Sequence, residues 1–427
     1  MTVATDYFAR VRPLLGEGLS RQVVAFEGDP DVAALVIELL ASCMLEHVGG
    51  GDAFVAQHAW KRPFAPLRTS PAPADARIVA RRGPASIAWS HDTVTMTADP
   101  DDPLAHVDIS YHVARTLRDV LLGAPASATP RQPFDPRGIT FDARGKHVMV
   151  IGCGSLGSEA VRMLQPARFT LVDDATVTVY NLARQWFGAA DVGRAKVDAL
   201  QDRLDNTRTW RTRLEAQDLP AFEARLREDP PDVVLLATGT HHHAMLAELL
   251  WHLGIPHVAA CCYARARYFE VSVIAPREHT PCLHCFRGHL YRGPAEPIPD
   301  DVAAFLYEPA ADEVRAQRYT DLVAEPASQL ETLRAAHVLA RCAIELLSPT
   351  RSPWFARVLA DSTTCLLGGN VAGAYGITHP GQVLRLGLDD IAGPTDQIRC
   401  DVCRRTMQVA LRDDLPILDD AADAAFL

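Results

Sequence analysis

The sequence predicts an α/β protein whose main part is a doubly wound, mostly parallel sheet, preceded by a smaller α+β domain. Three observations lead to this prediction. From His147 onward, short apolar runs alternate with segments of helical periodicity. The stretch 147–172 places a glycine-rich turn between an expected strand and an expected helix. The 427 residues exceed one ordinary domain, and Gly123–Arg137 has the proline-rich composition of a linker.

Composition and charge exclude several classes of function. The formal net charge is −11 at pH 7, whereas a protein that binds nucleic acid or anionic membranes needs a basic face. The most apolar stretch, Val32–Leu45, contains Glu38 and is shorter than the roughly 20 residues of a spanning helix. We expect no secretion signal, and the two C-x-x-C pairs of the chain indicate a bound metal and a reducing compartment. We therefore expect a cytoplasmic protein that binds neither nucleic acid nor membrane.

The N-terminal part is expected to be a domain of its own. Helical spacing of apolar residues predicts helices over Asp31–His47 and Val107–Leu122, and alternation over Arg77–Ala98 predicts two short strands. Nothing in this part carries recognisable chemistry. Three roles stay open for it: a degenerate half-copy of the main fold, a peptide clamp, or a domain that recognises a partner. The expected division of the chain is 1–130, a linker at 131–146, and 147–427 with a crossover loop at 289–326.

The main domain is expected to alternate strands with helices, which favours a parallel sheet covered on both faces. The predicted strands are His147–Ile151, Phe169–Val172, Trp210–Ala216, Val233–Ala237, His257–Ala260, Tyr268–Ile274 and Phe355–Ala360. The predicted helices are Leu156–Leu164, Lys196–Leu204, Pro220–Glu228, Ala244–Leu253 and Gln329–Leu347. Residues 268–274 alternate like an antiparallel addition to the sheet.

A nucleotide is the expected ligand of the turn Gly152-x-Gly154-x-x-Gly157. Glycines let the backbone turn tightly and approach phosphate, while the helix that follows offers free N–H groups to an anion. Asp173 ends the second strand of this Rossmann-like arrangement, at the position from which a carboxylate typically binds a ribose hydroxyl. The turn by itself suits NAD and ATP alike.

The residues downstream of this strand favour nucleotidyl transfer over hydride transfer. The loop that follows Asp173 supplies, in order, Asn181, Arg184, Gln185 and Lys196. When a carboxylate attacks the α-phosphate, charge builds on that phosphate, and fixed cations and amide donors stabilise it. A hydride-transfer site has no need of such a set.

Two C-x-x-C pairs form the strongest single signal in the chain, namely Cys282, Cys285, Cys400 and Cys403. Four thiolates match the closed tetrahedral shell of structural zinc, whose binding free energy becomes folding free energy. The site would join the segment after the core sheet to the C-terminal tail. A redox dithiol is the alternative, but no thioredoxin-like context accompanies the pairs. His284 is expected to be exposed rather than a ligand.

As an ordered set, these motifs between His147 and Cys403 resemble the superfamily of ThiF, molybdopterin-synthase adenylyltransferase and the ubiquitin-activating enzymes, here with an extra N-terminal domain. Members adenylate the C-terminal glycine of a ubiquitin-like protein, or a peptide carboxylate, with Mg-ATP. The resemblance thus implies ATP, Mg²⁺ and structural Zn²⁺ as cofactors. It also implies a ubiquitin-like or sulfur-carrier protein as partner, a possible downstream conjugating or sulfur-transfer protein, and a homodimer.

The resemblance also assigns roles by position. It implies that Gly152, Gly154 and Gly157 hold the phosphates and that Asp173 holds the ribose. Further contacts with the nucleotide would come from Asn181, Arg184, Gln185 and Lys196. Of these, Arg184 and Lys196 would stabilise the transition state.

One departure from the family concerns magnesium. The family usually has an aspartate just after the strand expected at Val233–Ala237, whereas this chain has Gly239 in the run Ala-Thr-Gly-Thr-His. Either Asp174 or another acid supplies the ligand, or ATP and water hold the ion, or the protein binds nucleotide without efficient turnover. The last case gives the alternative function, a weakened scaffold that presents a precursor or leader peptide to a modifying enzyme.

Some relatives pass the activated carboxylate to a cysteine in the crossing loop, which has none here. If a thioester forms, Cys262 and then Cys365 are the candidates, with burial in the core as the alternative for both. The run of histidines at 241–243 is expected to cap its helix or contact phosphate rather than bind a second metal.

Overall fold

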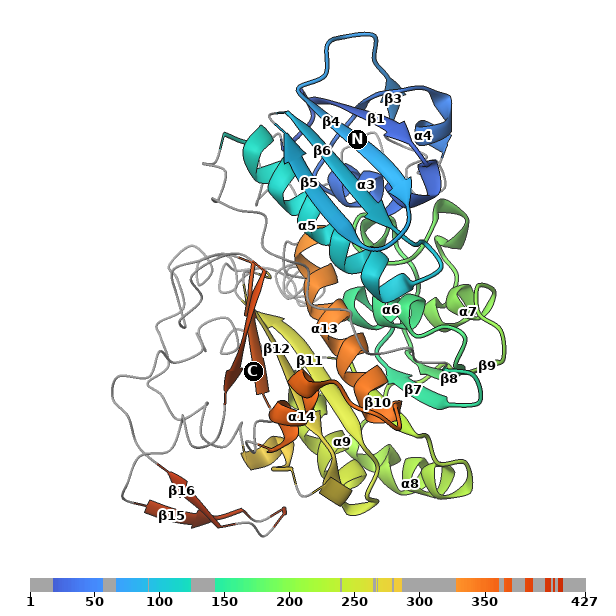
Figure 1. Cartoon of the computed structure of the whole chain (residues 1–427). Coiled ribbons are helices and arrows are strands. Elements are labelled where there is room, and N and C mark those ends of the chain that lie inside the picture. Colours follow the sequence, from blue (N-terminus) through green and yellow to red (C-terminus); the bar gives the residue numbers. More distant parts are fainter. Residues whose placement is uncertain are drawn as a thin grey trace, which may run out of the picture.

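The computed structural model arranges the chain as two sheets with helices between them (Figure 1). The described residues are 18–56, 67–90, 92–123, 143–238, 240–263, 266, 268–278, 280–285, 328–360, 365–370, 381–386, 396–400, 402–403 and 406–409.

The larger sheet has eight strands in the order β14-β13-β12-β11-β10-β7-β8-β9. Its parallel strands are β7 (His147–Ile151), β8 (Arg168–Val172), β9 (Thr207–Trp210), β10 (Val233–Leu236) and β11 (His257–Tyr263). Its antiparallel strands are β12 (Tyr268–Ile274), β13 (Cys365–Gly369) and β14 (Gln382–Leu386). The strand order reverses between β7 and β10, so the expected doubly wound, mostly parallel, Rossmann-like sheet is confirmed.

Helices cover both faces of this sheet because the central strands are apolar on both sides. On one face, Val148 and Val150 share a buried cluster with α6 (Ser155–Met163), α7 (Lys196–Gln201), α13 (Gln329–Leu347) and α14 (Pro353–Ala360). On the other, Met149 and Ile151 share a cluster with α8 (Leu219–Glu228) and α9 (Thr240–His252). Two strands near the C-terminus form a separate antiparallel hairpin, namely β15 (Asp396–Arg399) and β16 (Thr406–Val409).

The N-terminal sheet has six strands in the order β3-β2-β1-β4-β6-β5. These are β1 (Val23–Gly28), β2 (His47–Gly49), β3 (Arg68–Thr69), β4 (Ala76–Arg82), β5 (Ser86–Ser90) and β6 (Thr93–Ala98). Along β6, Val94 and Met96 are buried while their neighbours are only half-buried, because one face of the sheet alone carries helices. Those helices are α3 (Pro30–Ser42) and α5 (Pro103–Leu121), with the short α4 (Asp52–Ala56) beside them.

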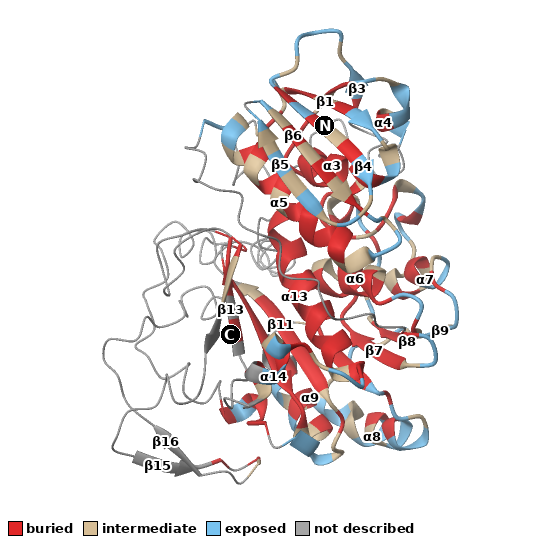
Figure 2. Cartoon of the chain, viewed as in Figure 1, coloured by how far each residue is buried: buried red, intermediate tan, exposed pale blue. Residues whose placement is uncertain are grey.

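Two helix layers meet between the sheets. Helices α3 and α5 of the N-terminal sheet pack against α13, and α5 also contacts α6. Every residue of α13 except Leu346 is buried, which Figure 2 shows as a red helix at the centre of the molecule. A single apolar cluster runs through both layers, from Leu19 to Leu366. The two parts of the chain therefore share one core.

Three expectations about elements need correction. Residues 353–360 form helix α14, not a strand; Pro353 opens it, and the Ser352 hydroxyl accepts from the Phe355 N–H at 3.1 Å as a cap. The strand expected at Trp210–Ala216 ends at Trp210, since it pairs with β8 through 207–210. Residues 77–98 hold three strands rather than two, and β1 had not been expected.

The remaining predicted helices occur, and α13 matches its predicted range of Gln329–Leu347. The helix expected over Asp31–His47 ends at Ser42, and His47 opens β2. None of the helices in the described part of the chain is long and apolar enough to cross a membrane.

Candidate functional site

A pocket of about 290 Å³ opens at the carboxyl ends of β7, β8 and β10, where the strand order reverses. Open α/β sheets bind ligands at this place because the loops on either side separate. Backbone and side chains from four strand ends contribute to it. The lining residues are Ile151, Gly152, Gly154, Val172, Asp173, Asp174, Ala175, Lys196, Thr212, Arg213, Leu214, Ala237, Thr238 and Leu246.

The glycines of the turn have three different steric roles. Gly152 has φ +94°, and a Cβ there would lie 2.4 Å from the Ala237 carbonyl oxygen, so only glycine fits. A Cβ on Gly157 would lie 1.9 Å from the Gly152 carbonyl oxygen, which lets α6 pack closely on the turn. A Cβ on Gly154 would meet nothing within 4 Å. Gly154 thus leaves open space in front of the helix.

The first turn of α6 is free to receive an anion. Gly154 caps this helix without any side-chain hydrogen bond, and the first turn holds no acidic residue. The N–H groups and the positive dipole end therefore face the pocket without a competing carboxylate. This is the feature of the site that most favours a phosphate group.

Asp173 and Asp174 place carboxylates beside the turn. The Asp173 carboxylate accepts from the Cys153 N–H at 2.6 Å and from the Ala175 N–H at 2.8 Å. It therefore holds the glycine turn against the end of β8, and its remaining lone pairs face a pocket that it lines. Asp174 is exposed and lines the same pocket.

Lys196 is the cation that the sequence predicted and that the structure brings to the pocket. It is the first residue of α7, and its N–H donates to the Ala175 carbonyl at 3.0 Å, which ties the start of α7 to the loop after β8. Thus Gly152, Gly154, Asp173 and Lys196 lie around one pocket.

Asn181, Arg184 and Gln185 do not line this pocket. They lie in and after the single 3₁₀ turn Val179–Asn181, where Asn181 caps the turn by accepting from the Thr178 N–H at 2.9 Å. The side chains of Arg184 and Gln185 are buried, at 9% and 4% exposure. The Trp186 N–H donates to the Ser158 hydroxyl at 3.2 Å, which ties this loop to α6.

Three polar residues of the pocket lining were not predicted from the sequence. Thr212 and Arg213 follow β9, and Thr238 follows β10. Arg213 adds a second cation at the rim, although it also pairs with Glu215 at 3.1 Å. The rule that ligands bind at the carboxyl ends of parallel strands would have found these residues, had the end of β9 been placed correctly.

A histidine holds the turn after β10, where this chain lacks the aspartate that the family usually has. His243 is fully buried, and its Nε2 accepts from the Thr238 N–H at 3.2 Å, so this ring nitrogen carries no proton. His243 thus holds the loop that precedes α9, and the expectation that the histidine run caps its helix or contacts phosphate stays a prediction. Gly239 and the side chains of His241 and His242 lie outside the described residues.

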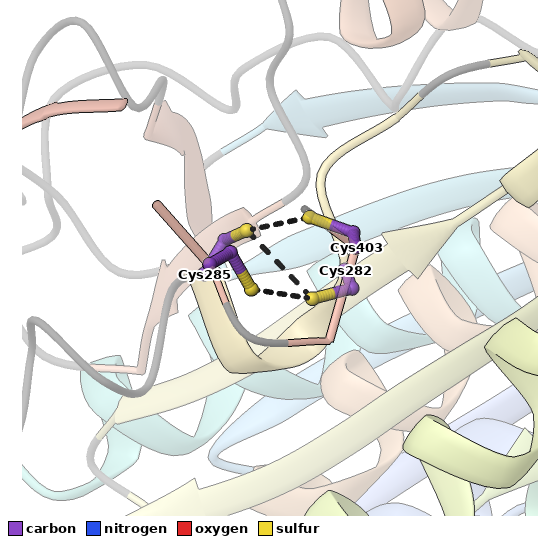
Figure 3. A group of neighbouring side chains, drawn as sticks. Cys282, Cys285 and Cys403 are labelled. Carbon is purple, nitrogen blue, oxygen red and sulfur yellow. Dashed lines mark hydrogen bonds between the residues drawn. The ribbon is translucent and has the colours of Figure 1, made fainter. Parts of the chain in front are cut away.

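Four cysteines converge after the end of β12, next to the end of α9. The sulfur atoms of Cys282, Cys285, Cys400 and Cys403 all lie within 4.8 Å of one another, three of them shown by label in Figure 3. Their closest separations are 3.4, 3.6 and 3.7 Å. A tetrahedral shell with metal–sulfur bonds of about 2.3 Å separates its sulfurs by about 3.8 Å. The four thiols therefore have the spacing of a closed metal site.

The surroundings of this cluster fit a structural role. The hydrogen bond from Cys285 lowers the pKa of Cys282 to about 5, while the pKa of the donating Cys285 is raised. Trp251, from the end of α9, packs both on this cluster and on the core beneath the sheet. His284 is exposed, as expected. Among the described residues, no other group of cysteine, histidine or acidic side chains has metal-ligand spacing.

The other cysteines are part of the core where they are described. Cys261 is buried and Cys262 is half-buried, both on β11. Cys365 opens β13, and its side chain lies outside the described residues. Burial raises the pKa of the Cys43 thiol to about 11, which leaves it unreactive near neutral pH.

Comparisons with known proteins agree with the predicted family. Residues 136–321 match the model of the ThiF family. No curated protein matches the chain. Among solved structures, E. coli MccB with MccA-N7isoASN is 14% identical over 61% of this chain and 68% of that chain, with a TM-score of 0.39. E. coli MccB with ATP is 12% identical over 57% and 64%, with a TM-score of 0.36. PaaA is 10% identical over 66% and 70%, with a TM-score of 0.36.

Proposed function

Residues 136–321 match the model of the ThiF family, and from this match we propose that the chain adenylates the C-terminal carboxylate of a small ubiquitin-like or sulfur-carrier-like protein at the expense of ATP. The observation that carries the proposal is the pocket at the strand-order reversal, which joins an uncapped helix N-terminus to Lys196 and Asp173. The N–H groups of α6 suit a phosphate, Asp173 suits a ribose hydroxyl, and Lys196 suits the charge between them.

The proposed step is an attack on phosphorus. A carboxylate oxygen of the partner forms a bond to the α-phosphorus of ATP, the bond to the bridging oxygen breaks, and pyrophosphate leaves with that oxygen. The product is an acyl adenylate. Lys196 would stabilise the negative charge that grows on the α-phosphate oxygens, because it opens α7 and lines the pocket. We also propose Arg184 for this role; its side chain is buried outside the pocket lining, so it would have to reach the phosphates from the loop that Asn181 caps.

Magnesium would assist by neutralising the phosphates. Mg²⁺ takes one or two carboxylates together with phosphate oxygens and water. Asp174 fits this need, since it is an exposed carboxylate on the pocket wall. We assign the place of the family's missing aspartate to Asp174, which follows β8 and lines the same pocket as Thr238, two strands away after β10.

Zinc is the proposed occupant of the four-cysteine cluster. The cluster offers four sulfur ligands at tetrahedral spacing, and Zn²⁺ is the structural metal that such sites hold. No other ligand position is needed, so the site would be structural rather than catalytic. The ion would fasten the segment of Cys282 to the tail of Cys403 and, through Trp251, to the main core.

One observation favours a second candidate function, a scaffold that binds a precursor peptide for a separate modifying enzyme. The turn after β10 carries no acid, and its Thr238 N–H donates to the His243 ring instead. If Asp174 does not bind magnesium, the site would bind ATP weakly or without turnover.

The test is exchange of labelled pyrophosphate into ATP with a panel of small proteins that end in glycine. Exchange should appear with one partner, require Mg²⁺, and fall by about 10²–10³-fold in Lys196→Ala and Arg184→Ala. Calorimetry with ATP alone runs in parallel. Binding of ATP without exchange for any partner, or no ATP binding together with binding of a precursor peptide by the N-terminal part, would favour the scaffold. A chain that binds neither ATP nor peptide would contradict both candidates.

A further inference from the structure

The two sheets of the chain have the same construction. The six strands β3-β2-β1-β4-β6-β5 correspond in order to β9-β8-β7-β10-β11-β12 of the larger sheet. The directions agree at all five pairings: four are parallel, and the last, β6 with β5 or β11 with β12, is antiparallel. The two halves differ in the order in which the chain visits these strands. In the N-terminal half, the chain passes from β4 to β6 through the short strand β5, whereas in the larger sheet it passes from β10 to β11 through helix α9.

The turn after the first strand repeats as well. Gly28 ends β1 with φ +93°, and a Cβ there would lie 2.1 Å from the Ala80 carbonyl oxygen in β4. Gly152 follows β7 with φ +94°, and its Cβ would lie 2.4 Å from the Ala237 carbonyl oxygen just past β10. Each glycine thus lets the first strand turn into a helix against the same neighbouring strand.

The helices complete the correspondence. In each half, one helix follows the glycine turn, α3 or α6, and a 19-residue helix packs beside it, α5 or α13. The two 19-residue helices also pack on each other. Their contact includes Asp108 and Arg334, each the sixth residue of its helix, with Oδ1 and Nη1 2.5 Å apart and both side chains buried. Contact between equivalent positions is the mark of a two-fold interface.

The interface between the halves is built like a protein core. Helix α13 lies between α5, α3 and α6, and one apolar cluster spans all four. Buried polar groups join them too: Gln329 of α13 donates to Glu38 of α3 and, at 2.7 Å, to Glu159 of α6. Interfaces of this apolar, buried kind belong to permanent partners.

The N-terminal half has lost the means to bind an anion. In the main half, the start of α6 has no side-chain cap. At the start of α3, the Asp29 carboxylate accepts from the N–H groups of Asp31 and Val32 at 2.9 and 3.3 Å. Arg82 pairs with both Asp29 and Asp31, at 2.6 and 2.7 Å. Burial opposes ionisation of Asp29, but the bonds from Arg82 and the backbone lower its pKa. A phosphate would therefore meet an ionised carboxylate.

From these observations we propose that residues 18–123 are a second, degenerate copy of the nucleotide-binding fold, and that this copy takes the place of a second subunit against α6 and α13. The chain is then an internal dimer with one nucleotide site. It has no need of the homodimer that the family resemblance implies, because the helix face that a partner would cover is already covered.

The test measures mass and nucleotide stoichiometry on the full chain. Sedimentation equilibrium over a wide range of protein concentrations, with and without ATP, should give the 46.6 kDa of one chain. Calorimetric titration with ATP should give one site per chain. A mass near twice that of the chain, or two ATP per chain, would overturn the proposal.

Two variants locate the site. Gly154→Asp puts in front of α6 the carboxylate that Asp29 places in front of α3, and it should abolish ATP binding without changing the mass. Asp29→Asn keeps the helix cap and should leave the stoichiometry at one. If Gly154→Asp still bound one ATP, the active copy would be the N-terminal one and the proposal would be wrong. A chain that binds no ATP yet sediments as a monomer would contradict the proposed function while supporting the internal dimer.

Discussion

Lys196 differs in its surroundings from Lys146, although both lie next to strands of the parallel sheet. Lys196 lies at the carboxyl ends of the strands and lines the pocket, whereas Lys146 precedes β7 at the opposite edge. We expect Lys196→Ala to weaken ATP binding and to lower pyrophosphate exchange by about 10²–10³-fold, because one cation is lost next to the growing charge. Lys146→Ala is the matched control and should change neither. Equal effects in the two variants would contradict the role of Lys196.

His257 makes stability depend on pH. It is fully buried at the start of β11, its Nδ1 donates to the Ile255 carbonyl at 2.9 Å, and burial lowers its pKa from 6.5 to about 4. The unfolded chain therefore binds a proton at a higher pH than the folded chain, so stability is lost as pH falls from about 6.5 toward 4. Between pH 7 and 5, we expect this residue to account for about 2 kcal/mol of lost unfolding free energy.

Urea unfolding at pH 7 and pH 5 measures this dependence. In His257→Asn, which keeps a donor for the Ile255 carbonyl, the loss between the two pH values should be smaller by about that amount. His252→Asn is the control, since His252 is exposed at the end of α9 and should leave the pH dependence as it is. An unchanged slope in His257→Asn would show that the buried ring does not govern it.

At the scale of elements, two ion pairs join α5 to α13: Arg118 with Glu331, and the buried pair of Asp108 with Arg334. Burial opposes the charge of Asp108, but Arg334 lowers the pKa of this carboxyl, so the pair is ionised. We expect Asp108→Ala to cost about 3–5 kcal/mol of unfolding free energy, since Arg334 would keep a buried charge without its partner. The double variant Asp108→Leu/Arg334→Met should recover most of this loss. A double-mutant cycle by urea unfolding checks the coupling, and simple additivity of the two changes would contradict it.

The four-cysteine cluster joins segments that the sheets do not hold together. We expect one zinc per chain by elemental analysis, and none in Cys403→Ser. Chelation should lower the midpoint of thermal unfolding, by roughly 1 °C for each kcal/mol of metal binding lost from a chain of 427 residues. Cys262→Ser removes a cysteine on β11 outside the cluster and should keep the metal. Zinc retained in Cys403→Ser would exclude this site.

The elements also show what the sequence could predict. The helix at 329–347 and the strand at 268–274 match their predicted ranges, because their apolar periodicity is long and unbroken. The helix at 353–360 is predicted as a strand because a short, mostly apolar run does not distinguish a strand from a helix, although its Ser-Pro start is a helix cap. In the site, the glycines and Lys196 were predicted because they belong to an ordered motif, whereas Arg213 and Thr238 belong to none. Their place depends on where distant strands end side by side.

At the scale of the whole molecule, the shared core predicts a single cooperative unfolding transition. Helices α3 and α5 bury their apolar faces against α13, so the N-terminal sheet cannot unfold without exposing the core of the larger one. ATP bound at the pocket should then protect both sheets alike, by about 2.7 kcal/mol at a ligand concentration of 100 times Kd. Hydrogen exchange followed separately for amides of β4 and of β10 measures this. If ATP protected β10 while β4 exchanged as in the free chain, the two halves would be independent domains and the pairing through α13 would carry no energetic coupling.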